Sequence, residues 1–312
     1  MMSKVDQRQN IDGILLVNKP NGLTSNAVLQ QVKRLFNAKK AGHTGSLDPM
    51  ATGMLPICFG EATKFCQYLL DADKCYETTG LLGIKTNTGD AMGEVIAQVD
   101  DFTVSESELN NVLLQFLGNI SQVPSMFSAL KHQGTPLYKF ARAGIEVERK
   151  AREISIHQLQ LNRFDGREVE LTVQCSKGTY IRNLIEDIGE QLGTGAHVTR
   201  LHRRYTAGLA NEPMFTMDEL NNKSAEQRLD CLLPMERAVC NLPKVLLDTD
   251  AVHMLRQGKV ITDMKSEPID GCVRLYDAEK KQFIGLGEMQ TPGILKVRRL
   301  LSEGASFQAS ME

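Results

Sequence analysis

The sequence lacks any long hydrophobic run. Its longest apolar stretches, residues 14–17 and 245–247, are far shorter than the ~20 residues that span a bilayer. The first residues also lack the charged, apolar and small-residue pattern of a signal peptide. We therefore expect a cytoplasmic protein that makes no membrane contact.

The sequence also lacks the cysteine spacing of a metal or disulfide site. Its seven cysteines are an odd number, without a C-x-x-C pair or histidines at zinc-ligand spacing. We expect reduced and mostly buried thiols, and we predict neither a metal nor a cofactor. The cysteines are Cys58, Cys66, Cys75, Cys175, Cys231, Cys240 and Cys272.

An excess of positive charge is absent as well. The net charge is −2 and the pI is about 6.3, which argues against a protein that coats nucleic acid indiscriminately. Basic residues nevertheless cluster in four places, at 33–40, 149–152, 200–204 and 296–299. Each cluster alone is typical of a solvated face, but the four together are consistent with a surface that follows RNA phosphates.

The chain is long enough for one large core and a small additional module. It has 312 residues, of which 42% are apolar and 24% charged, without an internal repeat or a low-complexity tract. We expect a flexible segment at 1–10, one large domain at 11–248 and a small β-rich module at 249–312. Gly-punctuated apolar segments predict the strands of that module near 273–276, 283–286 and 294–297.

Periodicity and capping signals predict alternating strands and helices in the large domain. A strand at 14–17 precedes a turn and a helix that reaches from Thr24 or Ser25 to about Phe36. The two alternating segments around Asp165-Gly166 predict a hairpin, and an amphipathic helix begins near Thr179. The other expected elements are strands at 54–59 and 74–83, helices at 62–70 and 105–117, and short capped helices after Thr216 and Ser224.

Residues 37–53 form an unusually long loop, rich in Gly, Pro and Thr. The loop lacks the Lys-Ser/Thr ending of a P-loop and the spacing of a dinucleotide site, which disfavours binding of a nucleoside triphosphate. Asp48 stands before Pro49, a pair that is common in plain turns. Among so many glycines, the same pair can also present a carboxylate to a flat substrate.

If Asp48 is functional, its chemistry is that of a nucleophile. A carboxylate is ionised at neutral pH and can attack carbon when it is oriented and shielded from water. Arg182, off the apolar stripe of the amphipathic helix, could supply the counter-charge by bidentate pairing. The alternative for Arg182 is a surface ion pair with Glu186, one turn along.

Three further side chains accompany these elements. Tyr76 and Tyr180 either fill the core or offer a ring on which an extruded base stacks, with a phenol that can move a proton. His43 either maintains the shape of the loop or contacts phosphate beside Asp48.

Several segments resemble the tRNA pseudouridine synthase B (TruB) family of bacteria. They are GHTGSLDPMATGML at 42–55, KCY at 74–76, VPSMFSALK at 123–131, KGTYIR at 177–182 and GAHVTRLHRR at 195–204. The resemblance extends from about Gly13 to Gly208 and is weaker beyond, where the chain is similar to a PUA-like module. Ser46, Met50 and Met54 differ conservatively from other members.

The resemblance implies an α+β (mixed α/β) catalytic domain around a largely antiparallel sheet. It implies isomerisation of uridine 55 in the T loop of tRNA to pseudouridine, by base flipping, in a monomer that contacts the T arm and the acceptor end. Asp48 then matches the nucleophile, Arg182 its partner, and Tyr76 the residue that stacks on the base and takes the C5 proton. Tyr180 and Leu201 match positions that line the uracil pocket, and His43 matches an RNA contact.

Two alternatives stay open at this level. A non-catalytic RNA-binding or RNA-folding protein would use the same cleft, although binding alone does not require a carboxylate that faces phosphates. A hydrolase with an aspartate nucleophile would need a second acid or base, or a metal. For the isomerase, the sequence does not decide between attack of Asp48 on C6 of uracil and attack on C1′ of ribose.

Overall fold

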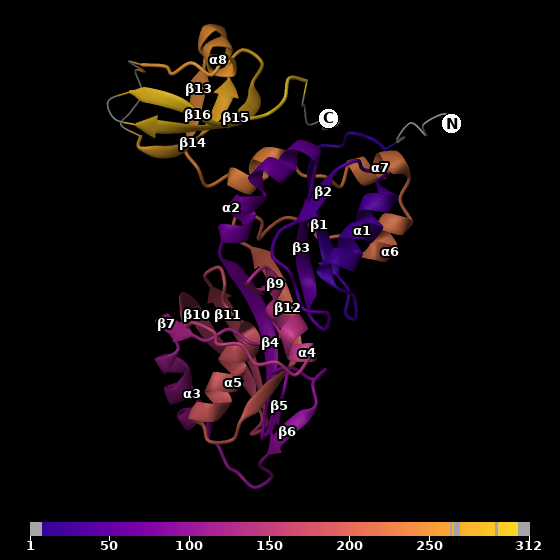
Figure 1. The fold of residues 1–312 in the computed structure, drawn as a ribbon, viewed down its shortest axis with the longest axis vertical. Helices are drawn as coiled ribbons and strands as arrows, with labels where there is room; N and C mark the ends of the chain where they lie inside the picture. Colours follow the sequence, from indigo (N-terminus) through magenta and orange to yellow (C-terminus); the bar gives the residue numbers. More distant parts are fainter. Residues whose placement is uncertain (1–7, 263, 265–268, 291–292, 305–312) are drawn as a thin grey trace.

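The described chain contains two main sheets at different heights of an elongated molecule, and two smaller two-stranded sheets (Figure 1). The computed structural model describes residues 8–262, 264, 269–290 and 293–304. Most of the segment expected to be flexible, residues 1–7, therefore lies outside the described residues. The two sheets confirm the expected α+β class, with a largely antiparallel core and a β-rich module towards the C-terminus. None of the described helices has the length and apolar character to cross a membrane.

The large sheet runs in the order β1-β3-β12-β4-β11-β10-β7, and β2 pairs with β3. Every pairing is antiparallel except that of β12 with β3. This one parallel step joins the two halves of the sheet. The strands are β1 (Gly13–Lys19), β2 (Ala41–His43), β3 (Thr52–Phe59), β4 (Lys74–Leu82), β7 (Gly118–Gln122), β10 (Arg152–Phe164), β11 (Glu168–Cys175) and β12 (Ala196–Thr206).

The first half of the sheet packs against α1 (Ser25–Leu35). Thr24 caps this helix by accepting a hydrogen bond from the backbone N–H of Ala27, as the sequence predicts. Val28 and Val32 are completely buried against Leu15 of β1 and Leu55 of β3. Apolar residues one turn apart on the helix thus meet alternating residues of the strands.

The second half of the sheet packs against α5 (Ile181–Gln191) and α3 (Glu106–Gln115). Leu184, Ile185 and Ile188 of α5 are buried against the alternating residues of β11, among them Leu171. Burial of each such side chain stabilises the fold by roughly 1.5–3 kcal/mol. The predicted hairpin and amphipathic helix are both confirmed.

The small sheet has the order β13-β14-β15-β16 and is accompanied by α8 (Thr249–Arg256). Its strands are β13 (Lys244–Leu247), β14 (Gly271–Asp277), β15 (Gln282–Gln290) and β16 (Ile294–Leu300). Phe283 of β15 packs against Phe65, with 5.4 Å between ring centroids, in a cluster that also contains residues of β3. Because β13 precedes residue 249, the small sheet begins earlier than the module predicted from sequence, and the domain boundary stays a prediction.

Short elements complete the fold. The expected helix at 62–70 is divided into a 3₁₀ turn, η1 (Gly60–Phe65), and the short helix α2 (Cys66–Asp71). The other short elements are β5 (Ile84–Thr86), β6 (Val95–Gln98), β8 (Lys131–His132), β9 (Thr135–Pro136), α4 (Leu137–Arg142), α6 (Met217–Asn221), α7 (Ala225–Leu229) and η2 (Met235–Val239). The capping boxes of α6 and α7 are formed as predicted.

Candidate active site

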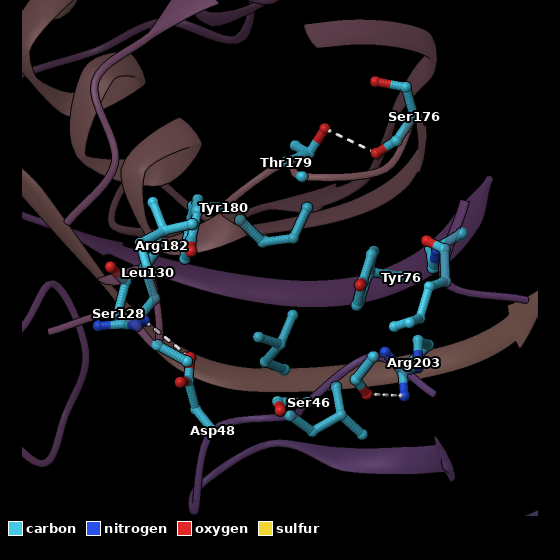
Figure 2. A pocket seen from close by; sticks show the side chains of 18 residues that line it. Ser46, Asp48, Tyr76, Ser128, Leu130, Ser176, Thr179, Tyr180, Arg182 and Arg203 are labelled. Carbon is cyan, nitrogen blue, oxygen red and sulfur yellow. Dashed lines mark hydrogen bonds and ion pairs between the residues drawn. The ribbon is translucent and has the colours of Figure 1, made fainter. Parts of the chain in front are cut away.

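A cavity of about 400 Å³ lies where the loop before β3 meets β4, β12 and the start of α5 (Figure 2). Five of the six site residues predicted from sequence line it, namely Asp48, Tyr76, Tyr180, Arg182 and Leu201. The other lining residues are Gly45, Ser46, Leu47, Leu70, Lys74, Ser128, Ala129, Leu130, Ser176, Gly178, Thr179, Ile181 and Arg203. Folding thus brings five separated segments of sequence to one place.

The loop that carries Asp48 is fixed by the N-terminal strand and helix. Lys19 is completely buried, and its Nζ donates to the carbonyl oxygens of Pro49 at 3.1 Å and Ala51 at 2.7 Å. Ser25 Oγ accepts from the backbone N–H of Leu47 at 2.8 Å and donates to its carbonyl at 3.1 Å. The strand and helix at the start of the large domain therefore position Asp48, the residue that follows Leu47.

Arg182 is the partner of Asp48. Its Nε lies 2.8 Å from Asp48 Oδ2, and its side chain is only 3% exposed, whereas that of Asp48 is 36% exposed. The predicted ion pair forms, in preference to a pair with Glu186, but it is not bidentate. The two remaining nitrogens of the guanidinium instead donate to the carbonyls of Thr88 at 2.6 Å and Phe127 at 2.9 Å. These carbonyls hold the guanidinium plane and leave Nε for the carboxylate.

Opposing effects act on the Asp48 carboxyl. Burial raises the pKa of Asp48 above its ordinary value, and the nearby Asp90 adds to this rise. Arg182 and, more weakly, Lys19 favour the charged form and lower the pKa. The carboxylate is thus half-buried at the cavity and paired with a buried cation, an arrangement that suits a nucleophile.

Asp90 is a site residue that the sequence analysis missed. Its Oδ2 lies 3.8 Å from Arg182 Nε, and the residue is 6% exposed. Its Oδ1 accepts from Thr88 Oγ1 at 2.7 Å and from the Met92 backbone N–H at 3.0 Å. The Asp90-Ala-Met-Gly93 turn gave no signal beyond that of an ordinary loop, so only the fold identifies it.

Tyr76 and Arg203 form a second wall of the cavity (Figure 2). Tyr76 is 9% exposed, and burial raises its pKa, which keeps the phenol protonated at neutral pH. Arg203 is opposite Tyr76 in the register of β12 and β4 and donates to the carbonyls of Met54 at 2.7 Å and Gly45 at 2.9 Å. A buried arginine thus joins the sheet to the Asp48 loop.

A glycine is needed where β3 approaches this arginine. Gly53 has φ +99°, and a Cβ at this position would lie 2.2 Å from the carbonyl oxygen of Arg203. The glycine therefore permits the parallel pairing of β3 with β12.

Tyr180 and Leu201 complete the lining. Tyr180 immediately precedes α5, and its backbone N–H donates to Gln122 Oε1 at 2.8 Å, which ties it to β7. Leu201 is 6% exposed on β12 and points to the same side of the sheet as Arg203, two residues along. Both side chains therefore face the space between Asp48 and Tyr76.

His43 is placed differently from the other five predicted residues. It ends β2, opposite Ile57 of β3, and is not among the residues that line the cavity. Burial, followed by the positive charge of Arg203, lowers its pKa, so the ring is neutral at pH 7. Its Nδ1 is buried and has no hydrogen-bond partner within the described residues.

The described side chains offer no cluster of three or more His, Cys, Asp or Glu residues that could bind a metal. All seven cysteines are free, and four of them are buried, as the sequence predicts. The polar side chains that line the cavity are instead the Asp48–Arg182 pair, Lys74, Arg203, two tyrosines, and the hydroxyls of three serines and a threonine.

Comparison with known proteins identifies the fold as that of a pseudouridine synthase. The matching family models are the TruB family pseudouridylate synthase N-terminal domain at 33–181, the tRNA pseudouridylate synthase B C-terminal domain at 182–240, and the pseudouridine synthase II TruB C-terminal model at 243–301. The chain belongs to the tRNA pseudouridine synthase B family. Its relative from Legionella pneumophila (strain Philadelphia 1) is 59% identical over 96% of this chain and 99% of the relative. The relative from Tolumonas auensis is 50% identical over 97% and 96%.

Solved structures share the fold across both sheets. A Cbf5-Nop10-Gar1 complex contains a chain that is 27% identical, with a TM-score of 0.70, over 92% of this chain and 84% of that one. An H/ACA RNP bound to a substrate RNA containing 2′-deoxyuridine contains a chain that is 25% identical, with a TM-score of 0.67, over 92% and 84%. The fold is therefore shared by proteins that are only about a quarter identical to this one.

Proposed function

We propose that this protein isomerises uridine 55 in the T loop of tRNA to pseudouridine, with Asp48 as the nucleophile. One observation carries the proposal. The Asp48 carboxylate lies 2.8 Å from a buried arginine, in a cavity walled by Tyr76 and Leu201. A protein that only bound RNA would gain nothing from a carboxylate at the point where the base enters, since the RNA is itself negatively charged.

The reaction needs a nucleophile, a way to retain the base and a proton transfer. The N1–C1′ bond breaks, the uracil turns, and C5 replaces N1 at the ribose, so that no atom is gained or lost. Asp48 attacks either C6 of the ring or C1′ of the ribose, and Arg182 keeps its reactive oxygen directed into the cavity. Proximity of the bound base to an oriented carboxylate supplies much of the rate.

The target base must leave its stack to reach Asp48. Extrusion costs a few kcal/mol, which stacking and phosphate contacts must offset. The ring of Tyr76 offers the stacking surface, and Leu201 and Tyr180 enclose the base. The buried phenol of Tyr76 also lies where a proton from C5 can be received. Since that phenol is protonated in the resting enzyme, it releases its own hydrogen to solvent as the C5 proton arrives, and N1 of the turned base takes up one proton, so the proton count balances. The bond between Asp48 and the ring or ribose breaks again before the product leaves.

The remaining RNA contacts involve the rest of the chain. His43, a neutral ring beside the Asp48 loop, would contact the RNA next to the extruded base. The relatives named tRNA pseudouridine synthase B support tRNA as the partner. In our proposal the T arm lies at the catalytic domain (11–248) and the acceptor end at the PUA-like module (249–312). A monomer in the cytoplasm is sufficient for this arrangement.

Release of tritium from a T-arm stem-loop labelled at uridine C5 tests the proposal. The purified protein is incubated without metal or cofactor, beside the Asp48→Asn variant. Release by the parent alone supports both the isomerase and its nucleophile. Binding without release by the parent would favour the RNA-binding alternative, and release by Asp48→Asn would remove Asp48 from its role.

A further inference from the structure

An exposed ion pair lies beside the cavity, next to residues that line it, and is not explained by catalysis at Asp48. Lys177 Nζ lies 2.8 Å from Asp71 Oδ1, and the two side chains are 61% and 41% exposed. Asp71 follows the lining residue Leu70 at the end of α2, and Lys177 lies between the lining residues Ser176 and Gly178. The pair therefore joins two segments at the solvent side of the cavity, and Figure 2 shows the Ser176–Thr179 loop away from Asp48.

The cations that line the cavity are already bound by the protein. Arg182 is held by Asp48 and two backbone carbonyls. Arg203 donates to two carbonyls, and Lys74 Nζ donates to the carbonyls of Leu69, Leu70 and Ala72. Burial also lowers the pKa of Lys74 to about 8. An RNA phosphate that approached these groups would have to break buried hydrogen bonds.

Lys177 differs because its partner can be exchanged. An exposed lysine–carboxylate pair contributes little to stability, and a second anion competes for the ammonium at small cost. The backbone around it is also prepared for an anion. Gly178 has φ +81°, and within the described chain the N–H groups of Lys177, Gly178 and Thr179 donate to no backbone carbonyl. Successive free N–H groups beside a left-handed residue are typical of phosphate sites.

We propose that Lys177 binds a phosphate that flanks the extruded uridine, and that Asp71 holds the ammonium in place until this phosphate displaces it. The inference rests on the proposed function, because it assumes that RNA delivers a base into this cavity. It assigns Lys177 to binding and Asp71 to positioning of Lys177. The pair then has opposite effects on RNA binding, which a purely structural ion pair would not have.

Equilibrium binding of the T-arm stem-loop at several salt concentrations tests this assignment. Lys177→Met should weaken binding about five- to tenfold, as expected for loss of a charge-assisted contact. It should also reduce the slope of log K against log salt by about 0.7–0.9, the value for one phosphate. Lys85→Met is the matched control, because Lys85 pairs with exposed Glu190 away from the cavity. It should leave affinity and slope unchanged.

The second arm of the experiment changes the carboxylate. Asp71→Asn should tighten binding several-fold. The control is Asp73→Asn, which removes the same charge two residues further along the chain, where Asp73 pairs with His157, and it should tighten binding less. In the Lys177→Met background, Asp71→Asn should have no greater effect than Asp73→Asn. Weaker binding by both Asp71→Asn and Lys177→Met would overturn the proposal, since it would make the pair structural.

An RNA in which one phosphate is replaced by an uncharged group tests directly whether that phosphate is the ligand of Lys177. A stem-loop with a methylphosphonate at one of the two phosphates flanking the target uridine should bind the parent more weakly and Lys177→Met equally well. Sensitivity of both proteins to the same extent would exclude contact between Lys177 and either phosphate. Binding does not require turnover. Absence of tritium release would therefore refute the isomerase but would not change the measured contribution of Lys177 to RNA affinity.

Discussion

Asp48 and Asp90 share one cation, with 2.8 Å and 3.8 Å between their Oδ2 atoms and Nε of Arg182. The arginine is 3% exposed and its other nitrogens are bound by carbonyls, so it cannot follow a carboxylate that moves. Asp90 therefore raises the pKa of Asp48, and both carboxylates are held against the same guanidinium. This relationship yields the first prediction.

Asp90→Asn should lower turnover about 10–100-fold, because a misplaced nucleophile loses much of the benefit of proximity. It should also move the acid limb of the pH–rate profile. Asp48 reacts as the carboxylate, so activity is lost as the pH falls through its raised pKa. Asp90 contributes to that rise, so its neutral replacement should shift the limb to lower pH. A profile that keeps its midpoint would show that Asp90 does not act on Asp48 through charge.

Tyr76→Phe should bind the T-arm stem-loop with unchanged affinity, because the ring that stacks on the base is retained. Tritium release should fall strongly, because the phenol oxygen that receives the C5 proton is lost. Rapid-quench analysis would then find RNA that has reacted with Asp48 but kept its tritium. Full release would limit Tyr76 to a stacking surface.

Ser25→Ala should destabilise the protein by about 1–3 kcal/mol, the cost of leaving a buried N–H group without a partner. The lost bonds fix Leu47, next to Asp48, so kcat should fall as well. Thr24→Ala is the matched control. It removes only the helix cap at the neighbouring residue and should cost about 1 kcal/mol without a change in kcat. Equal kcat in the two variants would show that the hydrogen bonds of Ser25 do not position Asp48.

Glu186→Gln should raise the melting temperature at pH 8 and have little effect at pH 4. Burial raises the pKa of Glu186 to about 7, so the folded state binds a proton that the unfolded state has released. Stability is therefore complete below about pH 4.5 and decreases as the pH rises towards 7. The amide should recover on the order of 1 kcal/mol above pH 7, measured by thermal unfolding at both pH values. An equal gain in melting temperature at pH 4 and pH 8 would contradict the raised pKa of Glu186.

Sequence alone determined the local elements and predicted five of the residues that line the candidate site. The hairpin around Asp165-Gly166, the helix caps at Thr24, Thr216 and Ser224, and the apolar stripe of α5 follow from nearest-neighbour chemistry, which acts over a few residues. The motifs around Asp48, Tyr76 and Arg182 indicated the family, and with it the cavity in which these residues meet.

Tertiary structure decided what depends on contacts between distant segments. Lys19 and Ser25 fix the loop of Asp48, Asp90 shares its arginine, and Arg203 ties β12 to that loop. None of these residues stands in a pattern that distinguishes it from an ordinary strand, cap or turn. Their roles arise because the sheet order places β12 between β3 and β4. They also arise because a buried charge has a low free energy only where fixed dipoles or an opposite charge surround it.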